Sequence, residues 1–145
     1  QPLTETIQAL EDSGKIPKLD RSSDLLGPDA NSNGVRDDID SWIESLPITD
    51  AQKKAARQKA AHLQSTLTVD LTDKAALQAS GDRAAAAIVC ITDAFMPTYQ
   101  DGLDLSKKIQ AITFNTRERS MRYMDYNQAR SGSSTTLPQG NTCLP

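Results

Sequence analysis

The segment TDKAALQASGDRAAAAIVCITDAFMP, residues 72–97, decides the fold of this chain. It holds the longest uninterrupted apolar run of the sequence, AAAAIVCI at residues 84–91, and it lacks the alternation of apolar and polar residues that marks a strand. Alanine is the strongest helix former, and proline cannot continue a helix. The segment therefore predicts one long helix over residues 72–96 that Pro97 closes, with a break where Ser80 and Gly81 interrupt it.

Helix signals also dominate on both sides of this segment. Further helices are predicted over residues 3–10, 37–46, 49–66 and 105–130. Thr49 followed three residues later by Gln52 forms a capping box, which is typical of a helix start. The last helix carries one apolar stripe at helical spacing, made of Leu105, Ile109, Ile112, Met121 and Met124.

The composition supports a helical protein. Of the 145 residues, 37% are hydrophobic and only 4% aromatic, which disfavours a β-sandwich. The 16 basic and 19 acidic residues give a formal net charge of −3, and this excludes a sequence-blind nucleic-acid binder. No apolar run approaches the ~18 residues of a membrane span. We expect one all-α domain, residues 1–145, built as a compact bundle of about three long helices plus short ones.

The segment DANSNGVRDDID, residues 29–40, predicts a calcium site followed by a short helix, together spanning residues 25–46. Calcium takes six to eight oxygen ligands, and alternate residues of a tight loop can supply them. Gly34 stands at the sixth position, where the turn is sharp. The expected ligands are the side chains of Asp29, Asn31, Asn33, Asp37 and Asp40 and the carbonyl oxygen of Val35.

This EF-hand-like loop departs from the EF-hand at its twelfth position, where Asp40 replaces the usual glutamate. Residues 20–44 hold seven acidic and two basic residues, so their carboxylates repel one another without a cation. Few carboxylate ligands predict a modest affinity, typical of extracellular calcium modules. The alternative is an asparagine- and aspartate-rich turn that caps the helix from Asp37 and binds no metal.

The chain contains two cysteines, Cys90 and Cys143, whose separation resembles no metal-binding spacing. A disulfide between them would tether the tail, residues 131–145, to a buried helix and would indicate an oxidising compartment. The alternative is two unlinked thiols, one buried and one on a loose tail.

No catalytic constellation stands out in the sequence. His62 is the only histidine, and no acidic residue stands at hydrogen-bonding helical spacing from it, so a structural role is expected. Cys90 lies in an apolar context that does not favour a thiolate. Phosphate-binding glycine loops and metalloprotease motifs are missing. We therefore expect a binding protein rather than an enzyme.

The block NTRERSMRYMDY, residues 115–126, is rich in arginine and tyrosine. Its arginines are expected on the solvated face of a helix, with Glu118 paired to Arg122. The alternative is a partner surface that includes Tyr126, because both residue types are favoured anchors in interfaces. Trp42, close to the predicted calcium loop, is expected to be the core contact that docks that loop.

Several segments in order resemble a family of small exported bacterial proteins, often lipoproteins, with one calcium loop and a late cysteine. Within it, the chain resembles the periplasmic immunity lipoproteins that are paired with muramidase effectors of type VI secretion systems. The resemblance covers most of residues 25–145. It rests on GPDANSNGVRDDIDSWI (27–43), IVCI (88–91), NTRER (115–119), YNQARSG (126–132) and PQGNTC (138–143).

This resemblance implies a protein that binds a peptidoglycan-hydrolase effector in the periplasm and plugs its glycan groove. A start directly after a lipidated cysteine would fit Gln1, and the lipid would anchor the protein to a membrane. Two segments with glycine, serine or threonine are expected to protrude as the plug, unless they are ordinary helix connections. Their candidate contact residues are Tyr99, Gln100, Asp101, Ser133 and Ser134.

A second class of function stays open. The chain could instead be a calcium-dependent structural or adhesion module of the cell envelope, which binds wall or surface ligands and no toxin. A one-to-one complex with a peptidoglycan hydrolase distinguishes the immunity protein from this module.

Overall fold

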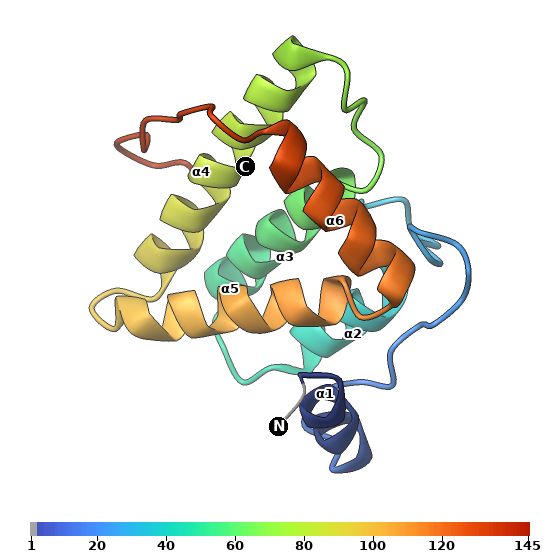
Figure 1. Cartoon of the computed structure of the whole chain (residues 1–145). Coiled ribbons are helices and arrows are strands. Elements are labelled where there is room, and N and C mark those ends of the chain that lie inside the picture. The colour runs from blue at the N-terminus through green and yellow to red at the C-terminus, as the bar shows by residue number, and fades with distance from the viewer. Residues whose placement is uncertain (1–2) are drawn as a thin grey trace.

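The computed structural model describes residues 3–145, with side chains from residue 7 onward. Within that range the chain forms six α-helices and no strand, so the expected all-α class is confirmed (Figure 1). No helix of this part of the chain is long and apolar enough to cross a membrane. The helices are α1 (Leu3–Asp12), α2 (Asp37–Ser45), α3 (Asp50–Ser65), α4 (Lys74–Ala94), α5 (Tyr99–Thr113) and α6 (Arg117–Ala129).

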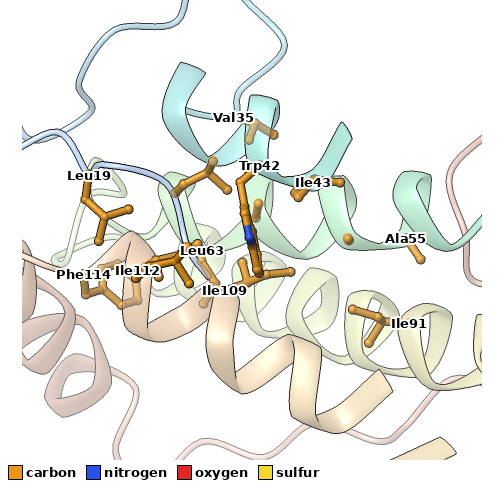
Figure 2. Packing of buried hydrophobic residues seen from close by; sticks show 14 of the residues in the cluster. Leu19, Val35, Trp42, Ile43, Ala55, Leu63, Ile91, Ile109, Ile112 and Phe114 are labelled. Atoms are coloured by element: carbon orange, nitrogen blue, oxygen red, sulfur yellow. The ribbon is translucent and has the colours of Figure 1, made fainter. Parts of the chain in front are cut away.

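Helices α3, α4 and α5 pack against one another and enclose most of the core, and α2 lies across α3 and α5. Figure 2 shows how aliphatic side chains from these helices meet in one cluster. Leu63 comes from α3, Ile91 from α4, and Ile109 and Ile112 from α5, and all four are buried. Burying one such side chain stabilises a protein by roughly 1.5–3 kcal/mol, so this cluster accounts for the association of the three helices.

Two local predictions are confirmed: the capping box at the start of α3 and the burial of Trp42 in the core. The Thr49 side chain accepts a hydrogen bond from the backbone N–H of Gln52, whose side chain accepts one from the N–H of Thr49. Trp42 is buried in the core, and its indole N–H donates to the carbonyl oxygen of Lys15 at 3.2 Å. Trp42 is therefore a core residue, as expected, but its hydrogen bond goes to the segment after α1 and not to the predicted calcium loop.

Helix α4 runs without the break expected at Ser80 and Gly81. Both residues are buried instead, because α6 and the residue after it pack on this turn. The Ser80 hydroxyl lies 2.7 Å from the hydroxyl of Tyr126, and the Arg130 guanidinium covers Gly81 so closely that a Cβ there would lie 2.2 Å from it. Ser80 and Gly81 therefore do not end the helix. Their small size leaves space for Tyr126 and Arg130.

The single helix expected over residues 105–130 is wrong, because the chain turns after Thr113 and begins α6 at Arg117. Phe114 is buried and stacks on Tyr123, with ring centroids 4.1 Å apart, which fixes the turn. Thr116 then caps the new helix by accepting from the N–H of Arg119. The continuous apolar stripe was therefore not real: Met121 and Met124, on α6, are 49% and 67% exposed.

The tail lies along α4, as the red segment of Figure 1 shows. Cys90 and Cys143 form the expected disulfide, with sulfur atoms 2.07 Å apart. The hydroxyl of Thr142 donates to the carbonyl oxygen of Ala86 at 2.7 Å. Closing a loop of this size with a disulfide stabilises a fold by roughly 3–4 kcal/mol in the chain-entropy model.

Helices α4 and α5 cross at Gly102, and this crossing yields a stability prediction. A Cβ on Gly102 would lie 2.7 Å from the carbonyl oxygen of Ile91, so the helices would have to separate. Gly102→Ala should lower the free energy of unfolding by about 1–3 kcal/mol, measured by urea denaturation. Lys108→Ala, on an exposed position of the same helix, is the control and should change it by less than about 0.5 kcal/mol. Equal stability of the two variants would contradict the close crossing.

Candidate functional site

The loop of residues 29–40 is closed by its first residue. The carboxylate of Asp29 accepts hydrogen bonds from the backbone N–H of Asn33 at 3.2 Å and of Gly34 at 2.9 Å. Gly34 has φ = +80°, a conformation that residues with a Cβ rarely adopt. These bonds curl the chain so that alternate side chains face the inside of the loop.

The last residue of the loop, Asp40, is shared between the loop and helix α3. One carboxylate oxygen, Oδ2, accepts from the amide nitrogens of Asn33 at 2.9 Å and Asn31 at 3.4 Å. The other, Oδ1, accepts from Nε of Arg57 at 2.7 Å. Burial favours the neutral acid, but the bonds from Arg57 and the two amides outweigh it, and the pKa of Asp40 is lowered.

The six predicted ligands all belong to this loop, and two more of them bond to other residues of the loop. The Asp37 carboxylate accepts from the N–H of Ala30 at 3.0 Å. Val35 is buried, and its N–H donates to the side-chain oxygen of Asn33 at 3.0 Å. No three His, Cys, Asp or Glu side chains in the described part of the chain are grouped to hold a metal ion. A cation here would rely on amide and carbonyl oxygens as well as carboxylates.

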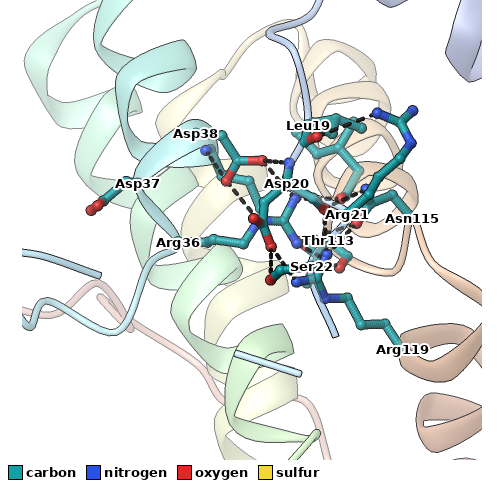
Figure 3. A network of polar contacts seen from close by, with 12 residues as sticks. Leu19, Asp20, Arg21, Ser22, Arg36, Asp37, Asp38, Thr113, Asn115 and Arg119 are labelled. Atoms are coloured by element: carbon teal, nitrogen blue, oxygen red, sulfur yellow. Dashed lines mark hydrogen bonds and ion pairs between the residues drawn. The ribbon is translucent and has the colours of Figure 1, made fainter. Parts of the chain in front are cut away.

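The loop contains one buried arginine, Arg36, which no sequence signal distinguished. Its guanidinium binds both carboxylate oxygens of Asp38, at 2.6 and 2.8 Å. The same group donates to the carbonyl oxygens of Ile112 at 3.1 Å and Thr113 at 3.2 Å, which end α5. Arg36 therefore joins the loop to the C-terminal end of α5, where a positive charge is favourable (Figure 3).

A second buried arginine, Arg119 of α6, holds the segment before the loop. It donates to the carbonyl oxygens of Asp20, Asp24 and Leu25 at 2.6, 2.8 and 3.0 Å. It also contacts the carboxylate of Asp20 at 2.7 Å and the side-chain oxygen of Asn115 at 2.9 Å. Arg119 is 0% exposed, so all of its hydrogen-bonding capacity is met inside the protein.

Two of the three arginines of α6 differ from the solvated face that the sequence predicts, whereas Arg117 is exposed as expected. Arg119 is buried, and Arg122 donates to the carbonyl oxygens of Leu67 and Val69, at 2.9 and 2.8 Å, instead of pairing with Glu118. Arginine satisfies carbonyl groups of distant segments as readily as a neighbouring acid. Only the fold brings those segments close, so helical spacing alone could not reveal these contacts.

The residues predicted to contact a partner are exposed, with the exception of Tyr126. Tyr99, Gln100 and Asp101 are exposed, but they form the first turn of α5 and not a protruding loop. Ser133 and Ser134 are exposed on the tail next to α4, where the Ser134 carbonyl accepts from Gln78. Tyr126 is 3% exposed. Its burial corrects the expectation that Tyr126 contacts a partner.

An open groove lies where α1, α5 and α6 meet, and part of its lining belongs to residues 115–126, which the sequence offered as an alternative partner surface. Its volume is about 740 Å³. The stacked rings of Phe114 and Tyr123 and the exposed side chain of Met124 line it, while Lys107 and Arg117 add positive charge. Exposed methionine beside aromatic rings is typical of surfaces that adapt to a partner.

His62 is buried on α3, and its Nδ1 has no hydrogen-bond partner within the described residues. The structural role agrees with the sequence, but the ring is not fully satisfied. Burial, together with the positive charges of Lys59, Arg83 and Arg130, lowers the pKa of His62 to about 4. The ring is therefore neutral at pH 7.

Comparisons of the chain with models of protein families, with curated proteins and with solved structures gave no match.

The buried guanidinium of Arg119 yields a second stability prediction. Arg119→Met should lower the free energy of unfolding by about 3 kcal/mol or more, because the Asp20 carboxylate and three carbonyl oxygens would lose their donor. Arg117→Met, two residues earlier and exposed, should change it by less than about 0.5 kcal/mol. Chemical denaturation of both variants measures the difference. A loss of similar size in both would show that the buried network does not hold the fold.

The neutral state of His62 predicts a pH dependence. A folded pKa near 4, below the ordinary value of 6.5, means that the unfolded chain binds the proton more tightly. Stability is therefore lost as the pH falls below 6.5 and levels off below about 4. From pH 7 to pH 4.5 this should cost about 2 kcal/mol. His62→Gln should lose correspondingly less over the same interval in urea denaturation, and an identical loss in both proteins would contradict the assignment.

Proposed function

We propose that this protein is an immunity protein that binds a periplasmic muramidase effector of a type VI secretion system and occludes its substrate groove. The sequence resemblance motivates the proposal, and the groove formed by α1, α5 and α6 is the observation that supports it best. Met124 is 67% exposed there, beside the ring of Tyr123. An exposed methionine beside aromatic rings in an open groove is typical of surfaces that adapt to a partner.

Charge also supports this surface. Lys107 and Arg117 line the groove, and both are exposed. Neither forms an ion pair within the residues that the structure describes. A muramidase presents acidic side chains in its own cleft, so opposite charges would meet and accelerate association. The groove on helices thereby replaces the protruding loops as the proposed contact surface.

A rigid scaffold favours tight inhibition. The disulfide between Cys90 and Cys143 and the bonds of Arg36 and Arg119 fix segments that would otherwise lose entropy on binding. A disulfide also fits an oxidising compartment, which agrees with the proposed periplasmic location. A lipidated cysteine before residue 1, anchoring the protein to a membrane, belongs to the same proposal.

We further propose that the loop of residues 29–40 binds one calcium ion. Asp29, Asn31, Asn33, Asp37 and Asp40 would supply side-chain oxygens, and Val35 its carbonyl oxygen. The loop already has the curvature that such a site needs, through the bonds from Asn33 and Gly34 to Asp29. Two features limit the affinity. The amides of Asn31 and Asn33 would have to turn their oxygens inward, and Arg57 already binds one oxygen of Asp40.

The inhibitor proposal predicts a difference between two exposed methionines. The purified protein should block wall cleavage by its co-encoded muramidase stoichiometrically and should not cleave peptidoglycan itself. Met124→Glu should weaken this inhibition by at least tenfold, because a carboxylate in the groove repels acidic groups of the enzyme. Met96→Glu, at a residue 63% exposed in the connection between α4 and α5 and outside the groove, should leave it unchanged.

Three results are informative. Loss of inhibition only in Met124→Glu supports the groove. Loss only in Met96→Glu keeps the immunity function but places the contact elsewhere. Failure of the parent protein to inhibit at excess rejects the immunity function and favours a calcium-dependent module of the envelope.

The calcium proposal predicts opposite effects of two substitutions. Calorimetry should detect one calcium ion with a dissociation constant on the order of 10⁻⁴–10⁻³ M. Asp29→Ala should abolish this binding, because it removes a ligand and opens the loop. Arg57→Gln should strengthen it several-fold, since both oxygens of Asp40 become available. Asp50→Ala, outside the loop, is the control, and absence of binding heat in the parent protein would refute the site.

A further inference from the structure

A small pocket lies between α3, α4 and the tail, and it shares no lining residue with the loop of residues 29–40 or with the groove of α5 and α6. Its volume is about 230 Å³, below the roughly 300–1,000 Å³ of pockets for drug-sized ligands. Ala61, Ala86 and Leu144 give it apolar walls, and His62 and Arg83 lie at the same pocket. It can therefore take only a small molecule.

The tail is held over this pocket by more than the disulfide. Both ends of the Gln58 amide bind the tail: its nitrogen donates to the carbonyl oxygen of Thr142 at 3.1 Å, and its oxygen accepts from the N–H of Leu144 at 2.8 Å. Thr142 in turn binds the carbonyl oxygen of Ala86. The pocket is thus preformed, and Gln58 is not available to a ligand.

Positive charge collects around His62 without an acidic partner. Lys59, Arg83 and Arg130 all lie near enough to disfavour its protonation. None of these three cations forms an ion pair with an acid in the part of the chain described here. Nδ1 of His62, which lies at this pocket, is also buried without a hydrogen-bond partner among the described residues. A buried ring nitrogen of this kind usually has a partner in native proteins, and the surplus of positive charge around it favours an anionic one.

We propose that this pocket binds a small carboxylate with a short apolar body. The Arg83 guanidinium would hold the carboxylate, because its planar fork matches two carboxylate oxygens. Ala61, Ala86 and Leu144 would cover the apolar body. A bare inorganic anion fits less well, because apolar walls would leave its remaining oxygens without hydrogen bonds. This site does not depend on the proposed immunity function.

The single histidine of the chain gives a direct probe. Proton NMR of the His62 ring should show a saturable change when N-acetylalanine is added to the full-length protein. The same ligand should raise the pKa of His62, because a nearby negative charge favours its charged form. N-acetylalanine amide, which has the same body without the carboxylate, and sulfate, which lacks the body, are the comparison ligands.

Arg83→Gln should weaken the binding of N-acetylalanine at least tenfold, whereas Lys108→Gln, at an exposed cation on α5, should leave it unchanged. Arg83 is exposed, so the variant is expected to fold, and circular dichroism checks this. Three outcomes would overturn the proposal: no saturable response in the parent protein, equal binding of the amide or sulfate, or equal binding by Arg83→Gln.

Discussion

Two guanidinium groups that water does not reach impose the strongest constraint on this structure. Arg36 and Arg119 are 2% and 0% exposed, and a buried charge is tolerated only when its hydrogen bonds are satisfied. Arg36 meets this need at the end of α5, and Arg119 meets it on the irregular segment that contains Asp20 and Asp24. The long stretch between α1 and α2, which has no helix of its own, is thereby fixed to the α5–α6 corner (Figure 3).

This arrangement has a consequence for binding surfaces. A corner held by buried ion pairs keeps α6 at a set angle to α5, although α6 makes few contacts with the other helices. The groove beside Phe114 and Tyr123 then has a defined shape. The disulfide likewise fixes the position of the tail, and with it the shape of the small pocket that the tail lines. Both surfaces are therefore presented by covalent or buried polar links rather than by apolar packing alone.

Much of the local structure could be predicted because it depends on neighbouring residues. The capping box at Thr49 follows from side chains within one turn of the backbone they bind. The curvature of the loop depends in the same way on Asp29 and Gly34. The division of the last helix was missed, since Phe114 ends α5 by stacking on a ring nine residues later, and helical periodicity does not register such a contact.

The sequence by itself determined the all-α class, most helix positions and the curvature of the loop of residues 29–40, because helix propensity, capping and turn chemistry act over a few residues. Only the tertiary structure decided that Arg119 is buried, that Tyr126 lies inside and that Gly81 makes room for Arg130. These contacts join segments tens of residues apart, or, as at Tyr126, depend on which face of a helix the rest of the chain covers. An arginine or tyrosine side chain can bond either to water or to a protein group. Which of the two it bonds to depends on whether the packed chain buries it.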